Sequence, residues 1–260
     1  MSEGVRTPSS DLLHFSERGS GPALLLVHGL LVTGEMFESV LEPFARHYRV
    51  IVPDLRGHGR SSALPPPYTV AQLAADLTRL LEHLGVAASA VLGYSQGGAV
   101  AQQLALDHPE RCQRLVLACT YAFNMASLRE KIEGRLVPLL LALLGMERFA
   151  KLVIGQGLKE VSADRRDALM AVMAHQDRTL MTTAWRAAMA FDSRPRLREI
   201  RCPTLIIAGA NDSAVPEHHA NMLRSGIAGA ELSVVQGAGH ALIWTHPDEL
   251  VRRSESFLAR

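Results

Sequence analysis

The residues best suited to chemistry are a serine, an aspartate and a histidine, each of which follows a short apolar run. Ser95 lies in GYSQGG, Asp212 lies in GANDSAVP, and His240 ends GAGH. A serine hydroxyl becomes a nucleophile when a base takes its proton, and an imidazole does so best when a carboxylate holds its tautomer. The three side-chain types predict nucleophilic catalysis by Ser95, with His240 as general base and acid and Asp212 as the group that orients it.

The neighbours of Ser95 predict a sharp turn from a strand into a helix. Gly93 and Gly97 stand on either side of it, and small residues there let the chain turn without colliding with itself. The side chain in the turn would project beside the first N–H groups of the helix, where a developing negative charge is stabilised. Such a turn would present the nucleophile at the end of a sheet.

An oxyanion formed at a substrate carbonyl also needs hydrogen-bond donors. The backbone N–H of Gln96, directly after the serine, is one expected donor. The second is expected from the loop HGLL that follows the apolar run at 23–27, and we assign it to Leu30, with Leu31 close behind. The predicted oxyanion hole therefore consists of Leu30 and Gln96.

Six apolar runs predict the strands that position these residues. They are ALLLV (23–27), RVIVP (49–53), SAVLG (89–93), RLVLA (114–118), TLIIA (204–208) and ELSVV (231–235). Each run is continuous and not alternating, which is typical of parallel strands covered by helices on both faces. Helical patterns at 69–84, 96–107 and 247–259 alternate with them, so we expect an α/β protein with a mostly parallel, doubly wound sheet. The three candidate residues would then meet at the carboxyl edge of that sheet.

Residues 121–196 differ from the rest of the chain. They contain no strand-like run and are dense in Leu, Met and Ala, which predicts a helical cap. The expected α/β core comprises residues 1–120 and 197–260. A helical cap over a strand edge makes a concave apolar pocket for a substrate. The side chains that we expect to line this pocket are Leu31, Met125 and Trp185.

Composition and charge narrow the classes of partner. The chain has 27 Lys and Arg against 26 Asp and Glu, and its net charge of +1 provides no field that would recruit nucleic acid or an anionic membrane. Its first residues lack the basic start and apolar stretch of a secretory signal, and its most apolar window, VPLLLALLGM, is short for a membrane span. We expect a cytoplasmic protein that acts on a small molecule and binds neither nucleic acid nor membrane; a homo-oligomer is compatible with the sequence.

Metal and cofactor sites are not indicated. Cys112, Cys119 and Cys202 have an odd count and no C-x-x-C spacing, which argues against a disulfide framework or a zinc site. The segment PDLRGHGRSS (53–62) has turn glycines and charges that can pair locally, so we interpret it as scaffold and not as a set of metal ligands. We expect no cofactor and no metal.

In these motifs the sequence resembles the α/β-hydrolase superfamily over nearly its whole length. HGL (28–30) is similar to the oxyanion loop of that family, GYSQGG to its nucleophile elbow, and GAND and GAGH to its acid and histidine loops; the chain order Ser, Asp, His also agrees. The resemblance implies a Ser-His-Asp triad of Ser95, His240 and Asp212. The HGL form is similar to the cofactor-free esterase, lactonase, C–C hydrolase and haloperoxidase-like branches. The expected fold is the α/β-hydrolase fold with a helical cap inserted after the sixth strand.

The function expected first is hydrolysis of a small to medium hydrophobic carboxylic ester or lactone through an acyl-enzyme intermediate. A C–C bond hydrolase, or a perhydrolase and haloperoxidase-like enzyme, would use the same triad. Arg129, Arg135 or Arg186 facing the serine would favour the C–C reaction. A small-molecule receptor on a hydrolase scaffold is an alternative of another class, which multiple turnover would exclude.

Overall fold

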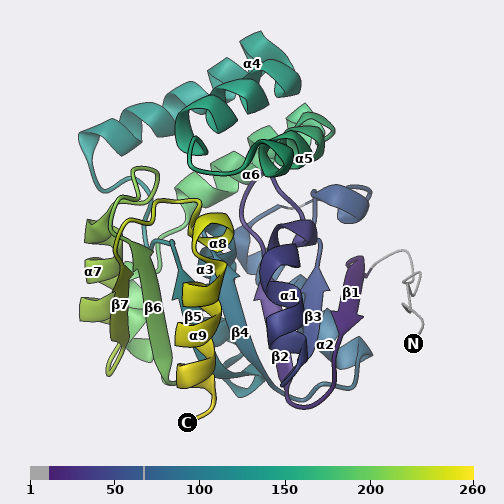
Figure 1. The fold of residues 1–260 in the computed structure, drawn as a ribbon, viewed down its shortest axis with the longest axis vertical. Coiled ribbons are helices and arrows are strands. Elements are labelled where there is room, and N and C mark those ends of the chain that lie inside the picture. The colour runs from purple at the N-terminus through teal and green to yellow at the C-terminus, as the bar shows by residue number, and fades with distance from the viewer. Residues whose placement is uncertain (1–11, 67) are drawn as a thin grey trace.

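A seven-stranded sheet forms the centre of the protein in the computed structural model, which describes residues 12–66 and 68–260 (Figure 1). The strands are β1 (Phe15–Arg18), β2 (Ala23–Val27), β3 (Arg49–Pro53), β4 (Ser89–Tyr94), β5 (Cys112–Ala118), β6 (Thr204–Gly209) and β7 (Glu231–Val235). Their order across the sheet is β1-β3-β2-β4-β5-β6-β7. Every neighbouring pair is parallel except β1 with β3. The sheet is therefore the mostly parallel, doubly wound sheet that the apolar runs predict.

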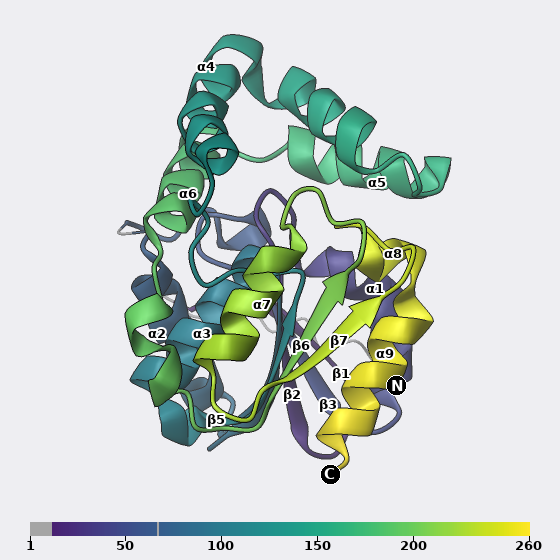
Figure 2. The same cartoon turned by 90° about the vertical axis from the view of Figure 1, so that its left-hand side faces the viewer.

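Helices cover both faces of this sheet. On one face lie α1 (Glu38–Ala45) and α9 (Pro247–Leu258), with the short α8 (Leu242–Thr245) beside them. On the other face lie α2 (Val70–His83), α3 (Gln96–Asp107) and α7 (Glu217–Gly226) (Figure 2). Short 3₁₀ helices occur at Gly34–Phe37, Gly59–Ser61, Pro109–Arg111 and Arg194–Glu199.

Each central strand buries both of its faces. In β2, Leu24 and Leu26 belong to the hydrophobic cluster on the side of α1 and α9, whereas Leu25 and Val27 belong to the cluster on the side of α2 and α3. All four side chains are fully buried. Because successive side chains of a strand point to opposite faces, two covered faces require an apolar residue at every position. This is why the strands are continuous apolar runs in the sequence.

The structure adds one strand to the six that the sequence predicts. β1 contributes one buried side chain, Phe15, and pairs at the edge of the sheet, so it has no continuous apolar run that would mark it as a strand. The position expected for the cap, after the sixth strand, is wrong. The cap helices follow β5, which is the fifth strand. Within the described residues, one strand, β1, precedes the first apolar run, and the first four runs form β2 to β5.

Three helices form a separate layer above the carboxyl edge of the parallel strands. These cap helices are α4 (Leu128–Gly157), α5 (Ala163–Ala174) and α6 (Arg178–Ala190) (Figure 1). α4 is broken at Gly145, whose φ of 71° is not helical. The division into a core of 1–120 and 197–260 and a cap of 121–196 stays a prediction, and residues 1–11 of that core lie outside the described residues.

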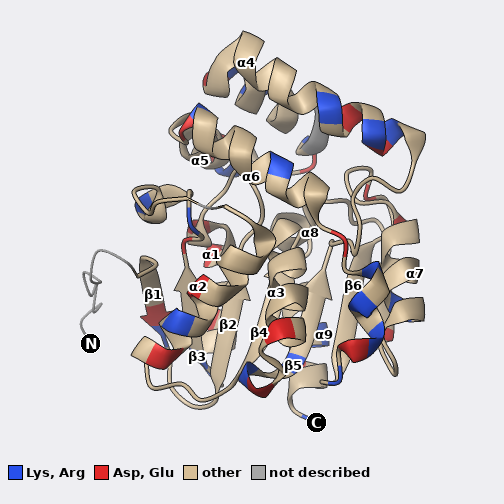
Figure 3. Cartoon of the chain, turned by 180° about the vertical axis from the view of Figure 1, so that it is seen from behind, with Lys and Arg blue, Asp and Glu red and all other residues tan. Residues whose placement is uncertain are grey.

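The outer helices carry side chains of both charges. α2 holds Asp76, Arg79 and Glu82, and acidic and basic positions also alternate along α4 (Figure 3). α4 additionally exposes a row of large apolar side chains, namely Leu128, Ile132, Leu136, Leu139 and Leu143. Within the described ranges, no helix combines the length and the apolar character needed to cross a membrane.

Candidate active site

Three strands end at the sites of the predicted catalytic residues. Ser95 directly follows β4, Asp212 lies three residues beyond β6, and His240 lies five residues beyond β7. These strands run parallel, so all three residues lie at the same edge of the sheet, beneath the cap helices (Figure 2). The topology therefore brings together residues that are 145 positions apart in sequence.

The three side chains form a hydrogen-bonded chain. His240 Nε2 lies 3.2 Å from Ser95 Oγ, and His240 Nδ1 lies 2.9 Å from Asp212 Oδ2. A carboxylate only accepts hydrogen bonds, so Nδ1 carries the proton and Nε2 presents its lone pair to the serine hydroxyl. This is the tautomer in which an imidazole can accept the serine proton.

The backbone holds Asp212 in place. Its second carboxylate oxygen, Oδ1, accepts hydrogen bonds from the N–H groups of Ala214 at 2.9 Å and Val215 at 2.8 Å. The carboxylate is nearly fully buried. One oxygen is thus engaged by the loop, and the other is left to orient His240.

The environment of His240 favours its protonated form. Burial lowers the pKa of the imidazole, but the charge of Asp212 and its hydrogen bond to Nδ1 raise that pKa by more, so the net pKa lies above the ordinary value of 6.5. A raised pKa makes the imidazole a stronger base toward the serine proton.

The turn at Ser95 has the strained geometry that the flanking glycines predict. Ser95 adopts a φ of 54°, in the left-handed region. A Cβ atom on Gly93 would collide with the carbonyl oxygen of Gly97, and one on Gly97 would collide with the carbonyl oxygen of Val27. Both glycines are therefore required by close backbone approach. Ser95 thus lies at the turn between β4 and α3, directly ahead of the first residue of α3.

The expected oxyanion-hole residues both lie near the serine. Gln96 is the first residue of α3, and the N–H groups at a helix start have no acceptor within the helix. The HGL loop passes against the nucleophile, because a Cβ on Gly29 would lie 3.2 Å from the Cβ of Ser95. Leu30 is the next residue and lines the same cavity as Ser95.

His28 holds the HGL loop in place. Its Nδ1 lies 2.7 Å from the carbonyl oxygen of Gly29, and its Nε2 accepts the N–H of Leu55 at 2.8 Å. Two such partners require the proton on Nδ1, and the ring is fully buried. His28 therefore ties the loop after β2 to the loop after β3.

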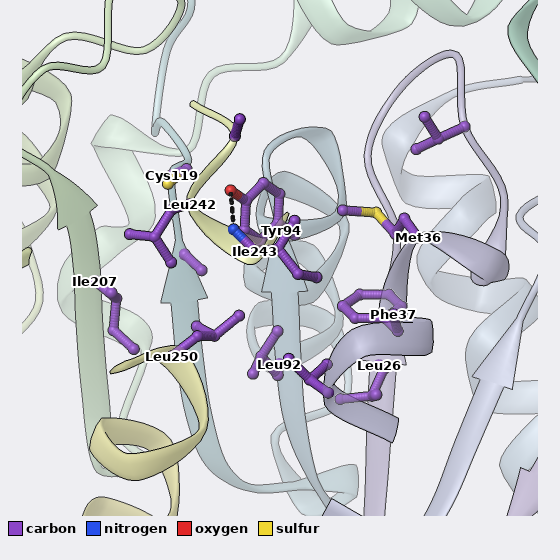
Figure 4. Close-up of a cluster of buried hydrophobic side chains, with 14 of the residues drawn as sticks. Leu26, Met36, Phe37, Leu92, Tyr94, Cys119, Ile207, Leu242, Ile243 and Leu250 are labelled. Carbon is purple, nitrogen blue, oxygen red and sulfur yellow. Dashed lines mark hydrogen bonds between the residues drawn. The ribbon is translucent and has the colours of Figure 1, made fainter. Parts of the chain in front are cut away.

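Two residues that sequence reasoning missed lie close to His240. The hydroxyl of Tyr94 donates to the carbonyl oxygen of His240 at 2.6 Å. The same hydroxyl accepts the N–H of Ile243 at 3.3 Å (Figure 4). The Cys119 thiol lies with the ligating atoms of Asp212 and His240 in a group whose atoms are all within 4.8 Å of one another. Tyr94 stands inside the GYSQGG motif, but nothing in the sequence indicates that its hydroxyl reaches a loop after β7.

A cavity of about 310 Å³ opens onto the serine. Its lining includes apolar side chains from the HGL loop and its surroundings, from the cap helices and from α8, namely Leu30, Leu31, Val32, Met36, Val153, Leu158, Met173 and Trp244. Polar lining residues besides Ser95 and His240 are Asn211, Ser213, Lys159 and Glu160. The serine hydroxyl therefore faces a small, predominantly apolar chamber.

Of the three predicted pocket residues, the structure places only Leu31 in this lining. Met125 and Trp185 are not among the cavity's lining residues. The Trp185 indole N–H donates to the carbonyl oxygen of Gly134 at 2.9 Å, and Met125 Sδ would lie 3.6 Å from a Cβ on Gly134. Both side chains thus pack against the first half of α4, whereas the second half, which carries Val153, faces the cavity.

Comparisons with known proteins agree with this architecture. The family described as alpha/beta hydrolase fold matches residues 22–247. The curated protein "Putative carbamate hydrolase RutD" of Caulobacter vibrioides is 32% identical over 263 residues, covering 95% of this chain and 96% of that protein.

Two solved structures extend the comparison. A hydrolase from Pseudomonas aeruginosa has a TM-score of 0.86 and 32% identity, covering 95% of this chain and 94% of its own. The enol-lactonase from Burkholderia xenovorans has a TM-score of 0.85 and 27% identity, covering 95% of this chain and 96% of its own. Because the family match and these relatives span most of the sequence and share its fold, the chain belongs to the α/β-hydrolase fold family.

Proposed function

We propose that this protein hydrolyses small, uncharged, hydrophobic carboxylic esters or lactones through an acyl-enzyme on Ser95. The observation that carries the proposal is the hydrogen-bonded chain from Ser95 through His240 to Asp212, which opens on an apolar cavity. A serine activated in this way attacks acyl carbon atoms. The similarity to an enol-lactonase supports an acyl substrate.

In the acylation step, His240 Nε2 takes the hydroxyl proton while Ser95 Oγ attacks the substrate carbonyl carbon. The former carbonyl oxygen then carries the negative charge of a tetrahedral adduct. As the bond to the leaving alcohol breaks, His240 Nε2–H donates its proton to the alcohol oxygen. Asp212 accepts the Nδ1–H throughout and stabilises the imidazolium.

Deacylation repeats the sequence with water. His240 Nε2 takes a proton from a water molecule, whose oxygen attacks the acyl carbon, and Ser95 Oγ leaves with the proton returned from the imidazole. In both steps we assign the oxyanion to the backbone N–H groups of Gln96 and Leu30. Removing one such donor typically lowers kcat by about 10²- to 10³-fold.

The cavity supports a small and uncharged substrate. Its volume of about 310 Å³ lies at the lower end for small-molecule sites. Besides His240, the charged side chains in its lining are Lys159 and Glu160, which have opposite charges and favour neither sign of substrate. Arg129, Arg135 and Arg186, which would favour a carboxylate-bearing C–C substrate, do not line it. An ester or lactone therefore fits better than an acidic C–C substrate.

The test is multiple-turnover hydrolysis of p-nitrophenyl esters from acetate to decanoate, together with a small lactone. We expect many turnovers, a preference for the shorter acyl chains, and a fall in kcat of at least about 10⁴-fold in Ser95→Ala. Ser213→Ala is the matched control, since Ser213 also lines the cavity but the His240 side chain forms its hydrogen bonds with Ser95 and Asp212. We expect this variant to keep wild-type kcat.

Three outcomes contradict the proposal. Equal turnover by wild-type protein and Ser95→Ala would exclude the serine mechanism. Release of at most one equivalent of product per chain would indicate a small-molecule receptor. Turnover of a ketonic substrate or of hydrogen peroxide with an acid, without ester turnover, would instead assign the triad to C–C cleavage or perhydrolysis.

A further inference from the structure

Three metal-ligating side chains that are not part of the triad converge where the start of α4 approaches α7. Glu130 Oε1 lies 3.1 Å from His218 Nε2 and 3.1 Å from His219 Nε2. All three atoms lie within 4.8 Å of one another. Glu130 belongs to the first turn of α4 and the two histidines to the first turn of α7, so the cluster joins a cap helix to a helix that covers the sheet.

The distances fit a tetrahedral metal. Zinc binds imidazole nitrogen and carboxylate oxygen at about 2.0–2.2 Å, which separates the ligand atoms of a tetrahedron by about 3.3–3.6 Å. The two separations of 3.1 Å are shorter by only a few tenths of an ångström, which small torsions of the exposed His218 and of Glu130 can supply. Two imidazoles and one carboxylate suit zinc and its late first-row neighbours, whereas Ca²⁺ and Mg²⁺ prefer oxygen ligands.

Hydrogen bonds already orient the carboxylate. Glu130 Oε2 accepts the N–H of Ser127 at 2.8 Å, and the Glu130 N–H donates to Ser127 Oγ at 3.2 Å, forming a capping box at the start of α4. This leaves Oε1 directed at the histidines, as an outer-shell hydrogen bond does in metal sites. Glu130 and His219 are buried, whereas His218 is 46% exposed. One side of the cluster is therefore open to water.

We propose that Glu130, His218 and His219 bind one zinc ion, or a similar late first-row divalent cation, with water as the fourth ligand. Each Nε2 then presents its lone pair to the metal, and each Nδ1 carries the ring proton. Because α7 follows the loop that holds Asp212, the metal ties the cap helix α4 to the element next to the acid loop.

The surroundings of His219 limit the expected affinity of the site for zinc. Its buried Nδ1 has no hydrogen-bond partner among the described residues. Loss of such an outer-shell acceptor typically lowers metal affinity about 10- to 100-fold. The site is therefore expected to bind zinc more weakly than a site whose histidines both have outer-shell acceptors, and to release it to chelators.

The experiment is a calorimetric titration of the chelator-treated full chain with zinc chloride. We expect one-to-one binding, at least tenfold weaker in His218→Gln and in Glu130→Gln; glutamine preserves the capping box in the second variant. His83→Gln, on the exposed side of α2, is the matched control and should bind like wild type. A hundredfold excess of zinc over Kd should raise Tm by about 5 °C in wild type and not in His218→Gln.

X-ray absorption at the zinc edge separates this site from the active-site group. The proposed site contains only nitrogen and oxygen ligands, whereas zinc bound by Cys119, Asp212 and His240 would show a sulfur ligand at about 2.3 Å. A sulfur ligand would overturn the proposal. So would the absence of one-to-one binding, or an affinity that neither His218→Gln nor Glu130→Gln changes. Without added zinc, His218→Gln should hydrolyse esters like wild type, since His218 lies outside the proposed catalytic machinery.

Discussion

Replacing Asp212 by asparagine should abolish most activity through the orientation of a single amide group. In the wild-type protein Oδ1 accepts the N–H groups of Ala214 and Val215. An asparagine oxygen must occupy that position, because turning the NH₂ toward two backbone donors would lose two buried hydrogen bonds, at about 2–6 kcal/mol in total. The NH₂ group then points at Nδ1 of His240 and donates to it.

This arrangement selects the wrong tautomer of His240. With Nδ1 as acceptor, the ring proton lies on Nε2, and the imidazole cannot take the proton of Ser95. We expect kcat in Asp212→Asn to fall about 10⁴-fold, which corresponds to about 5.4 kcal/mol of transition-state stabilisation.

The assay compares kcat of wild type and Asp212→Asn on the best p-nitrophenyl ester, with Tm measured in parallel. Asp248→Asn, at an exposed carboxylate in the first turn of α9, is the control for the chemical change itself and should keep wild-type kcat. A loss of less than tenfold in Asp212→Asn, with an unchanged Tm, would refute the tautomer argument.

Three further predictions concern the base, the elbow and the core. Burial lowers the pKa of His240, but Asp212 raises it by a larger amount, so the pKa lies above 6.5. Because His240 must be neutral to act as a base, kcat/KM should fall as the pH drops through that pKa, and a pH–rate profile checks this. Gly97→Ala should destabilise the protein by more than about 4 kcal/mol in thermal unfolding, since its Cβ would meet backbone oxygen atoms, whereas Gly155→Ala, with open space, should change stability by at most about 1 kcal/mol. Asp76→Ala should cost about 3–5 kcal/mol in urea unfolding, because it removes the buried carboxylate that pairs with Arg56 at 2.6 Å; a cost below 1 kcal/mol would contradict this.

The strands and the triad could be predicted from sequence because each has a local signal. A strand covered on both faces must be apolar at every position, and residues that follow parallel strands must lie at one edge. Ser95, Asp212 and His240 each follow such a run, so their convergence needed no knowledge of the packing. β1 gave no such signal, because an edge strand with one buried side chain, Phe15, reads like a loop.

The lining of the cavity could not be predicted in the same way. Side-chain direction in the cap helices depends on how α4 is bent, and the break at Gly145 turns its second half toward the serine. Trp185 and Met125 pack against the first half instead. The Tyr94 hydroxyl bond to the His240 carbonyl was also beyond sequence reasoning, because it joins segments 146 residues apart and only the folded sheet sets that distance.

At the elbow, steric contact constrains the two glycines, whereas catalysis constrains the serine. Gly93 and Gly97 are held by steric contact whether or not the protein catalyses anything, so a descendant without hydrolase activity should retain both. Ser95 is under the opposite pressure: its left-handed backbone costs about 1–3 kcal/mol, and glycine would relieve this strain once catalysis no longer mattered. In a related sequence, the two glycines would therefore indicate only that the fold is kept. The serine, together with Asp212 and His240, would indicate that catalytic activity is kept.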